Sequence, residues 1–161
     1  MPLRQDDIVT SNPTKSASER AMLVPELLCS DIGRSLSFYT DVLGFEVVYD
    51  RPEEKFSYLT LCGAELMLEQ VSDIDDKGES WITARLEFPY GRGISFQIEV
   101  EDVDSLYNRV LSVQWPLFRP VEDKWYRIRD GETGNRQFLI QDPDGYLLRP
   151  FEDLGFRSLV S

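Results

Sequence analysis

Short apolar runs separated by turn residues define the first half of the folded chain, which begins near Met22. Residues 23–29 have the pattern of a strand, and Asp31 then offers an N-cap to a helix that ends at Gly44. One stripe of this helix is apolar and consists of Ile32, Leu36, Tyr39 and Leu43. Three runs of β-prone residues follow, at 45–49, 56–62 and 65–71. The pattern predicts the element order βαβββ.

The second half of the chain repeats this order. A strand at 94–100 precedes a helix capped by Asp102, and the later strands are predicted near 117–118, 137–141 and 146–151. The additional residues of this half fall between 119 and 136, which we predict to be a loop. The repeat predicts an α+β fold of two βαβββ modules, related by pseudo-twofold symmetry, whose sheets form a cup.

The domain organisation follows from the same pattern. Residues 1–21 are rich in Ser, Thr, Asn, Asp and Pro and show little periodicity, so we predict a mobile N-terminal extension. Residues 22–161 form one domain, which is the size that a chain of 161 residues supports. Its modules span 22–72 and 93–155, and a connection at 73–92 joins them.

Alternation along the strands separates a helix-facing side from a polar side. In the strand at 94–100 the apolar residues at even-numbered positions are expected to cover the helix, which leaves Gln97 and Glu99 on the other face. The same alternation places further residues on this polar face, namely Glu26, Met67, Glu69, Arg149 and Phe151. We predict that these residues bind a ligand in the cup. The alternative is an ordinary solvated face of an antiparallel sheet.

Two large aromatic residues, Trp125 and Tyr126, fall inside the predicted loop. Aromatic side chains in such a position either fill the core or close over a ligand, and the sequence leaves both possibilities open. We include both residues among the predicted ligand-binding set, because aromatic rings beside carboxylates suit a planar cationic ligand.

Composition and charge narrow the choice of partners. The chain carries 17 basic and 29 acidic residues, with a formal net charge of −12 at pH 7, which disfavours nucleic acids and anionic membrane surfaces. Its apolar runs are shorter than the ~20 residues of a membrane span, and the N-terminus lacks a signal-peptide pattern. Cys29 and Cys62 do not form a CxxC pair, which favours a reducing compartment. These features predict a cytoplasmic protein.

The chain contains no histidine, which limits the chemistry that it can perform. A Ser-His-Asp or Cys-His site is excluded, although Glu69 or Glu99 remains available as a single general acid or base. The segment 142–145 begins like a calcium loop but lacks the downstream acidic ligand, so we predict a turn.

Four motifs in this order resemble the glyoxalase/bleomycin resistance/extradiol dioxygenase superfamily, and most closely its bleomycin-resistance-like members. They are VPELLCSDIGRSLSFYTDVLGFEVV, LCGAELMLE, ISFQIEVEDVDSLYNRV and QFLIQDPDGYLLRPFED. The resemblance implies that metal ligands of the family's enzymes would fall on Val24, Glu69, Ser95 and Arg149. Only Glu69 is a suitable donor, so we predict neither a metal nor another cofactor. A hard ion held by glutamates alone would meet the opposing charge of Arg149.

We therefore predict a metal-independent protein that sequesters a small molecule, such as a cationic glycopeptide antibiotic, and that forms a homodimer as the resemblance implies. The sequence favours binding over catalysis. An alternative is a divergent lyase, isomerase or oxygenase that uses carboxylates for metal or acid/base chemistry. A scaffold domain without a small ligand is a third possibility. We also hypothesise that Glu69 and Arg149 pair across the cup in place of the lost metal, because a buried charge requires a partner.

Overall fold

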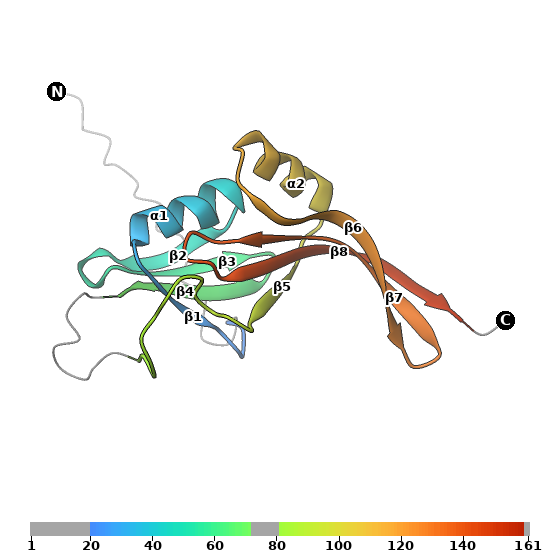
Figure 1. Ribbon diagram of the computed structural model, residues 1–161, viewed down its shortest axis with the longest axis horizontal. Helices are drawn as coiled ribbons and strands as arrows, with labels where there is room; N and C mark the ends of the chain where they lie inside the picture. The colour runs from blue at the N-terminus through green and yellow to red at the C-terminus, as the bar shows by residue number, and fades with distance from the viewer. Residues whose placement is uncertain (1–19, 72–80, 160–161) are drawn as a thin grey trace, which may run out of the picture.

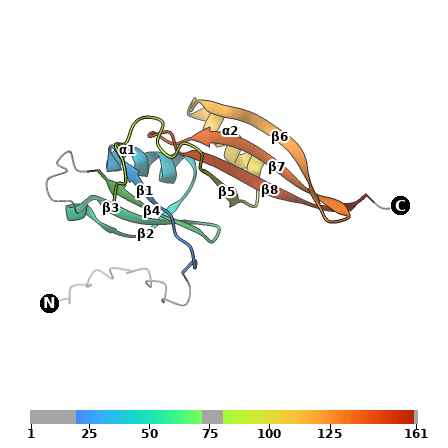
Figure 2. The same cartoon turned by 60° about the horizontal axis from the view of Figure 1, so that its bottom comes forward.

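Two four-stranded mixed sheets lie side by side in the computed structural model, which describes residues 20–71 and 81–159 (Figures 1 and 2). The first sheet has the order β1 (Glu26–Cys29), β4 (Ala64–Gln70), β3 (Phe56–Leu61), β2 (Glu46–Arg51). The second has the order β5 (Ser95–Glu99), β8 (Leu147–Ser158), β7 (Gly131–Gln141), β6 (Leu117–Ile128). In both sheets the first strand runs parallel to its neighbour and the other pairs are antiparallel. The identical order confirms the predicted pair of βαβββ modules.

One helical segment belongs to each sheet, and both segments lie on the same side of the molecule in Figure 1. Helix α1 (Ile32–Ser37) begins at Asp31, whose side chain accepts a 2.8 Å hydrogen bond from the Arg34 amide. It continues as a π-helix, η2 (Phe38–Val42). Helix α2 (Val103–Ser112) is capped in the same way by Asp102, and a short 3₁₀ turn, η3 (Pro52–Glu54), follows β2. The predicted caps are therefore confirmed.

The core lies between each sheet and its helix. Most residues that alternation assigned to the helix-facing side are buried, among them Leu27, Leu66, Leu68, Ile98 and Leu148, but Ile94 is 52% exposed. Burial of such side chains stabilises the fold by about 1.5–3 kcal/mol each.

The two modules meet through the helical layer and the turn between β7 and β8. The Phe38 and Trp115 rings lie 4.6 Å apart, and the Tyr146 hydroxyl donates a 3.0 Å hydrogen bond to the Leu28 carbonyl. Asp144, in the predicted turn, accepts hydrogen bonds from the backbone and the hydroxyl of Ser30. Contacts from both modules thus hold the two sheets in one arrangement.

The prediction of a loop at 119–136 is wrong, because most of this segment belongs to the long hairpin of β6 and β7. The hairpin extends with the end of β8 beyond the rest of the molecule (Figure 1). Charged residues dominate its sequence, so it lacks a clear apolar alternation. Its strands are stabilised instead by cross-strand pairs, such as Arg157 with Glu132 at 2.6 Å. Arg157 belongs to β8, which is distant from this hairpin in the sequence.

Most of the predicted mobile extension, residues 1–19, lies outside the described residues, as does part of the predicted connection at 72–80. Arg20 and Ala21, the last two residues of the extension, contact the first sheet. Within the described ranges, none of the helices has the length and hydropathy needed to cross a membrane.

Candidate functional site

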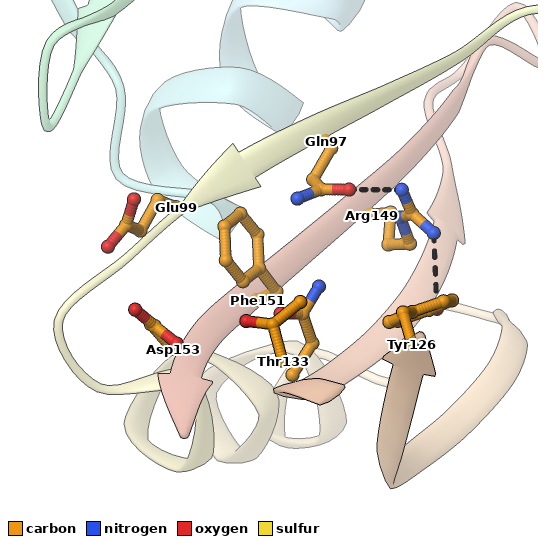
Figure 3. A pocket seen from close by; sticks show the side chains of 8 residues that line it. Gln97, Glu99, Tyr126, Thr133, Arg149, Phe151 and Asp153 are labelled. Carbon is orange, nitrogen blue, oxygen red and sulfur yellow. Dashed lines mark hydrogen bonds between the residues drawn. The ribbon is translucent and has the colours of Figure 1, made fainter. Parts of the chain in front are cut away.

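A pocket of about 380 Å³ opens on the second sheet, on the face turned away from α2 (Figure 3). All four strands of this sheet contribute to it. Its lining residues are Gln97, Glu99, Tyr126, Thr133, Asn135, Arg149, Phe151 and Asp153. Five of the nine predicted ligand-binding residues therefore line one pocket, namely Gln97, Glu99, Tyr126, Arg149 and Phe151.

Arg149 is held at one end of this pocket by neutral neighbours. Parallel pairing of β5 with β8 sets Gln97 beside Arg149, and the Gln97 side-chain oxygen accepts a hydrogen bond from the guanidinium. The Tyr126 hydroxyl accepts a second one, at 3.3 Å. The Nε atom is buried and makes no hydrogen bond within the described chain, and no described carboxylate forms an ion pair with this arginine. The guanidinium therefore keeps its charge available to an acceptor.

Two carboxylates, Glu99 and Asp153, lie toward the other end of the pocket, and Figure 3 shows the Phe151 ring between them and Arg149. Glu99 pairs with Phe151 across β5 and β8, while Asp153 pairs with Asn135 across β8 and β7. The pocket thus offers a cationic end, an aromatic surface and an anionic end. This arrangement suits a ligand that carries both an acceptor group and a positive charge.

The predicted residues Glu26, Met67 and Glu69 do not line this pocket, because they lie on the first sheet. Strand pairing places Glu26 beside Met67 there. Desolvation, a hydrogen bond with Glu69 and the charge of Glu69 raise the pKa of Glu26 above its ordinary value. The Glu26 carboxyl therefore holds its proton to a higher pH than an isolated glutamate does.

The hypothesised ion pair between Glu69 and Arg149 is wrong within one chain. Arg149 instead bonds Gln97 on its own sheet, and Glu69 lies on the other sheet near Glu26, whose pKa its charge helps to raise. Alternation correctly assigned both to polar faces, but it does not determine which faces lie opposite each other.

Trp125 and Tyr126 lie on opposite faces of β6, so only Tyr126 reaches the pocket. The Trp125 ring lies over Gly134 of β7, and the Arg157 guanidinium lies 4.0 Å from the ring centre. Neither residue is a loop lid, because both belong to a strand. The predicted ligand-binding role of Trp125 is not supported by this position.

Sequence reasoning missed three lining residues, Thr133, Asn135 and Asp153. Asp153 continues the alternation of Arg149 and Phe151 and could have been found by extending that strand. Thr133 and Asn135 fall in the segment that was predicted as a loop, so no alternation was available to identify them.

The residues at which the resemblance implies metal ligands do not fit a metal ion. Val24 and Ser95 offer no strong donor, Arg149 is a permanent cation, and Glu69 is the single carboxylate among these four residues. In the parts of the chain that the structure describes, no three Asp, Glu or Cys side chains cluster with the geometry of a metal site. The residues at these four positions therefore do not form a donor set suited to a transition-metal ion.

A second pocket, of about 430 Å³, lies at the junction of the modules. Its lining includes Arg34, Phe88, Trp115 and Phe118. None of the predicted ligand-binding residues lines this pocket, so we regard the pocket around Arg149 as the candidate site.

Comparison with known proteins places the chain in a family. Residues 21–149 match the model of the "Glyoxalase/Bleomycin resistance protein/Dioxygenase superfamily". A bleomycin resistance protein of Geobacillus stearothermophilus is 30% identical over 141 residues, which cover 81% of this chain and 96% of the relative.

Solved structures share the fold. TioX from Micromonospora sp. ML1 aligns over 83% of this chain and 100% of its own, with a TM-score of 0.60 and 21% identity. The fosfomycin resistance protein FosX from Listeria monocytogenes aligns over 81% and 90%, with a TM-score of 0.53 and 18% identity. The family model and the bleomycin resistance relative, together with the doubled βαβββ order, show that the chain belongs to the glyoxalase/bleomycin resistance protein/dioxygenase superfamily.

Proposed function

We propose that this protein binds and sequesters a small molecule in the pocket around Arg149, as the name of its bleomycin resistance relatives suggests. One observation carries the proposal. In a chain of net charge −12, the Arg149 guanidinium lies in a pocket without a carboxylate partner among the described residues. An acidic protein has many carboxylates available, so a guanidinium held only by neutral groups is suited to an acceptor on a ligand.

The pocket also defines the chemistry of the ligand. Its acceptor group would bond Arg149, a flat ring would stack on Phe151 or Tyr126, and a positive charge would lie near Glu99 and Asp153. A glycopeptide antibiotic of the bleomycin type combines such groups. A volume of about 380 Å³ is at the lower end of ordinary ligand sites, so the pocket would hold one part of such a molecule.

Homodimerisation and a cytoplasmic location remain predictions. A dimer would allow a second copy to cover the open face of the second sheet. Sedimentation velocity at several protein concentrations measures the oligomeric state directly, and a monomer at all concentrations would contradict the dimer.

Isothermal titration calorimetry with metal-free bleomycin tests the proposed function. We expect saturable binding, weakened roughly tenfold or more in both Arg149→Gln and Phe151→Ala. Arg119→Ala is the matched control, because Arg119 is exposed on β6 and outside the pocket. If bleomycin gives no saturable heat up to millimolar concentration, or if Arg149→Gln binds like the wild type, the assignment is wrong.

Catalysis is a second candidate, and the pairing of Glu26 with Glu69 is the observation that favours it. A carboxyl group whose pKa is raised keeps its proton to a higher pH and is better suited to act as a general acid. Metal analysis of protein incubated with divalent iron, zinc, nickel or manganese and then dialysed separates the metal-dependent alternatives. Stoichiometric metal that is lost in Glu69→Gln would overturn the metal-independent binding function.

A further inference from the structure

Three aromatic side chains form a ladder on the first sheet, on the face turned away from α1. Tyr49 of β2 stacks on Tyr58 of β3, with ring centres 5.2 Å apart and planes inclined by 20°. Phe56 lies 6.0 Å from Tyr49 on the same face. We call these three residues the aromatic face. It belongs to the first module and is separate from the Arg149 pocket.

The N-terminal segment places a guanidinium on this face. The central carbon of the Arg20 guanidinium lies 5.9 Å from the ring centre of Tyr49 and 5.8 Å from that of Tyr58. Both distances are in the range of a cation–π contact, which is worth about 0.5–2 kcal/mol. Arg20 thus occupies the position that a planar cationic ligand would take.

Hydrogen bonds fasten the residue next to Arg20. The Ala21 amide donates a hydrogen bond of 2.9 Å to Glu65 Oε2, and the Tyr58 hydroxyl donates one of 2.6 Å to the same oxygen. Glu65 is only 6% exposed and Tyr58 only 4% exposed, although both lie on the face away from the helix. The segment therefore docks through two contacts, one to the rings and one to Glu65.

The charges on this face favour a cation. Glu26, Glu65 and Glu69 lie on the same side of the first sheet as the aromatic face, as the pairing of β1 and β3 with β4 shows. The Arg51 guanidinium lies 3.8 Å from the ring centre of Phe56 and is paired with Glu54 at 2.5 Å. Since Arg51 covers Phe56, Arg20 covers the other two rings, those of Tyr49 and Tyr58.

We propose that Arg20 is a tethered occupant of the aromatic face, and that a free guanidinium or amidinium compound binds there by displacing it. This second site goes beyond the proposed function, because it uses neither Arg149 nor the pocket on the second sheet. A tethered occupant lowers the apparent affinity of a free ligand by the fraction of molecules in which the site is open. Removal of Arg20 should therefore raise that affinity by roughly 3- to 30-fold.

Benzamidine, a planar amidinium, is the probe, and the full-length chain is titrated by NMR. Arg20→Ala should bind benzamidine about tenfold more tightly than the wild type, with Arg20→Lys in between. Arg119→Ala, which removes an exposed arginine elsewhere, should match the wild type. The side-chain Nε–H signal of Arg20, identified by its loss in Arg20→Ala, should shift toward its solvent-exposed position as benzamidine saturates the wild type.

Two further variants locate the binding. Tyr49→Leu retains an apolar side chain but lacks the aromatic ring, so it should lose benzamidine binding, whereas Phe151→Ala in the other pocket should retain it. Equal affinities of the wild type and Arg20→Ala would overturn the proposal. An unmoved Arg20 signal at saturation, binding lost only in Phe151→Ala, or no binding by any variant would do so as well. A failure with bleomycin leaves this result unaffected, so the two proposals are tested separately.

Discussion

The Tyr39 hydroxyl donates a hydrogen bond of 2.9 Å to Asp142 Oδ2 and so links the helical segment of the first module to the last turn of the second. Tyr39 is fully buried and Asp142 is 4% exposed. The other carboxylate oxygen accepts the amides of Asp144 and Tyr146, each at 2.9 Å. This buried group therefore organises the turn and joins the two modules.

Removal of the hydroxyl in Tyr39→Phe should lower the free energy of unfolding by about 1–3 kcal/mol, because the buried acceptor on Asp142 loses a donor. Urea denaturation measures the change. Tyr107→Phe is the control: the Tyr107 ring packs on Phe138, and its hydroxyl makes no hydrogen bond with any described residue. Equal effects of the two substitutions would show that the inter-module bond contributes nothing.

The stability should depend on pH through Asp142. Burial is the largest effect on this carboxyl and raises its pKa from 3.8 to about 6, despite the hydrogen bonds from Tyr39, Tyr146 and Asp144. The folded protein then binds more protons than the unfolded chain between about pH 4 and pH 6. The contribution of protonated Asp142 to the free energy of unfolding is complete below about pH 4. It is lost as the pH rises through 6, and the loss is about 3 kcal/mol at most.

Asp142→Asn tests this pH dependence, because the amide keeps an oxygen for the turn and does not titrate. We expect the stability of the variant relative to the wild type to increase as the pH rises from 4 to 7. Thermal unfolding across this range measures the difference, and Asp50→Asn, at an exposed position, controls for the change in net charge. Parallel curves for the wild type and Asp142→Asn would contradict the raised pKa.

Gly134→Ala should destabilise the long hairpin. An added Cβ would lie 2.8 Å from ring carbons of Trp125, whose ring is also contacted by the Arg157 guanidinium. Displacing the ring should cost about 1–3 kcal/mol and change the tryptophan fluorescence. Gly33→Ala is the control, because its nearest neighbour would be 3.4 Å away and alanine favours the helix. A Gly134→Ala protein as stable as Gly33→Ala would exclude this close packing.

Much of the fold was predictable because its signals are local. The Asp31 and Asp102 caps each bond an amide three residues ahead, which requires only the nearby chain. The burial of Leu68 and Ile98, and the exposure of Gln97 and Glu99, follow from the two-residue period of a strand. Local patterns thus identified most of the elements, the repeat and the two faces of the strands.

Contacts between distant segments decided the rest. Trp125 and Tyr126 lie in a strand because β6 pairs with β7, which in turn pairs with β8. A short window of sequence does not reveal these pairings. Alternation placed Glu69 and Arg149 on polar faces, but sheet order put them on different sheets with different partners. The docking of Arg20 on Tyr49 and Tyr58 likewise joins segments far apart in the chain. The sequence by itself thus determined which side of most strands packs against a helix, and the tertiary structure determined which polar side chains meet, because that depends on how separate strands and sheets pack.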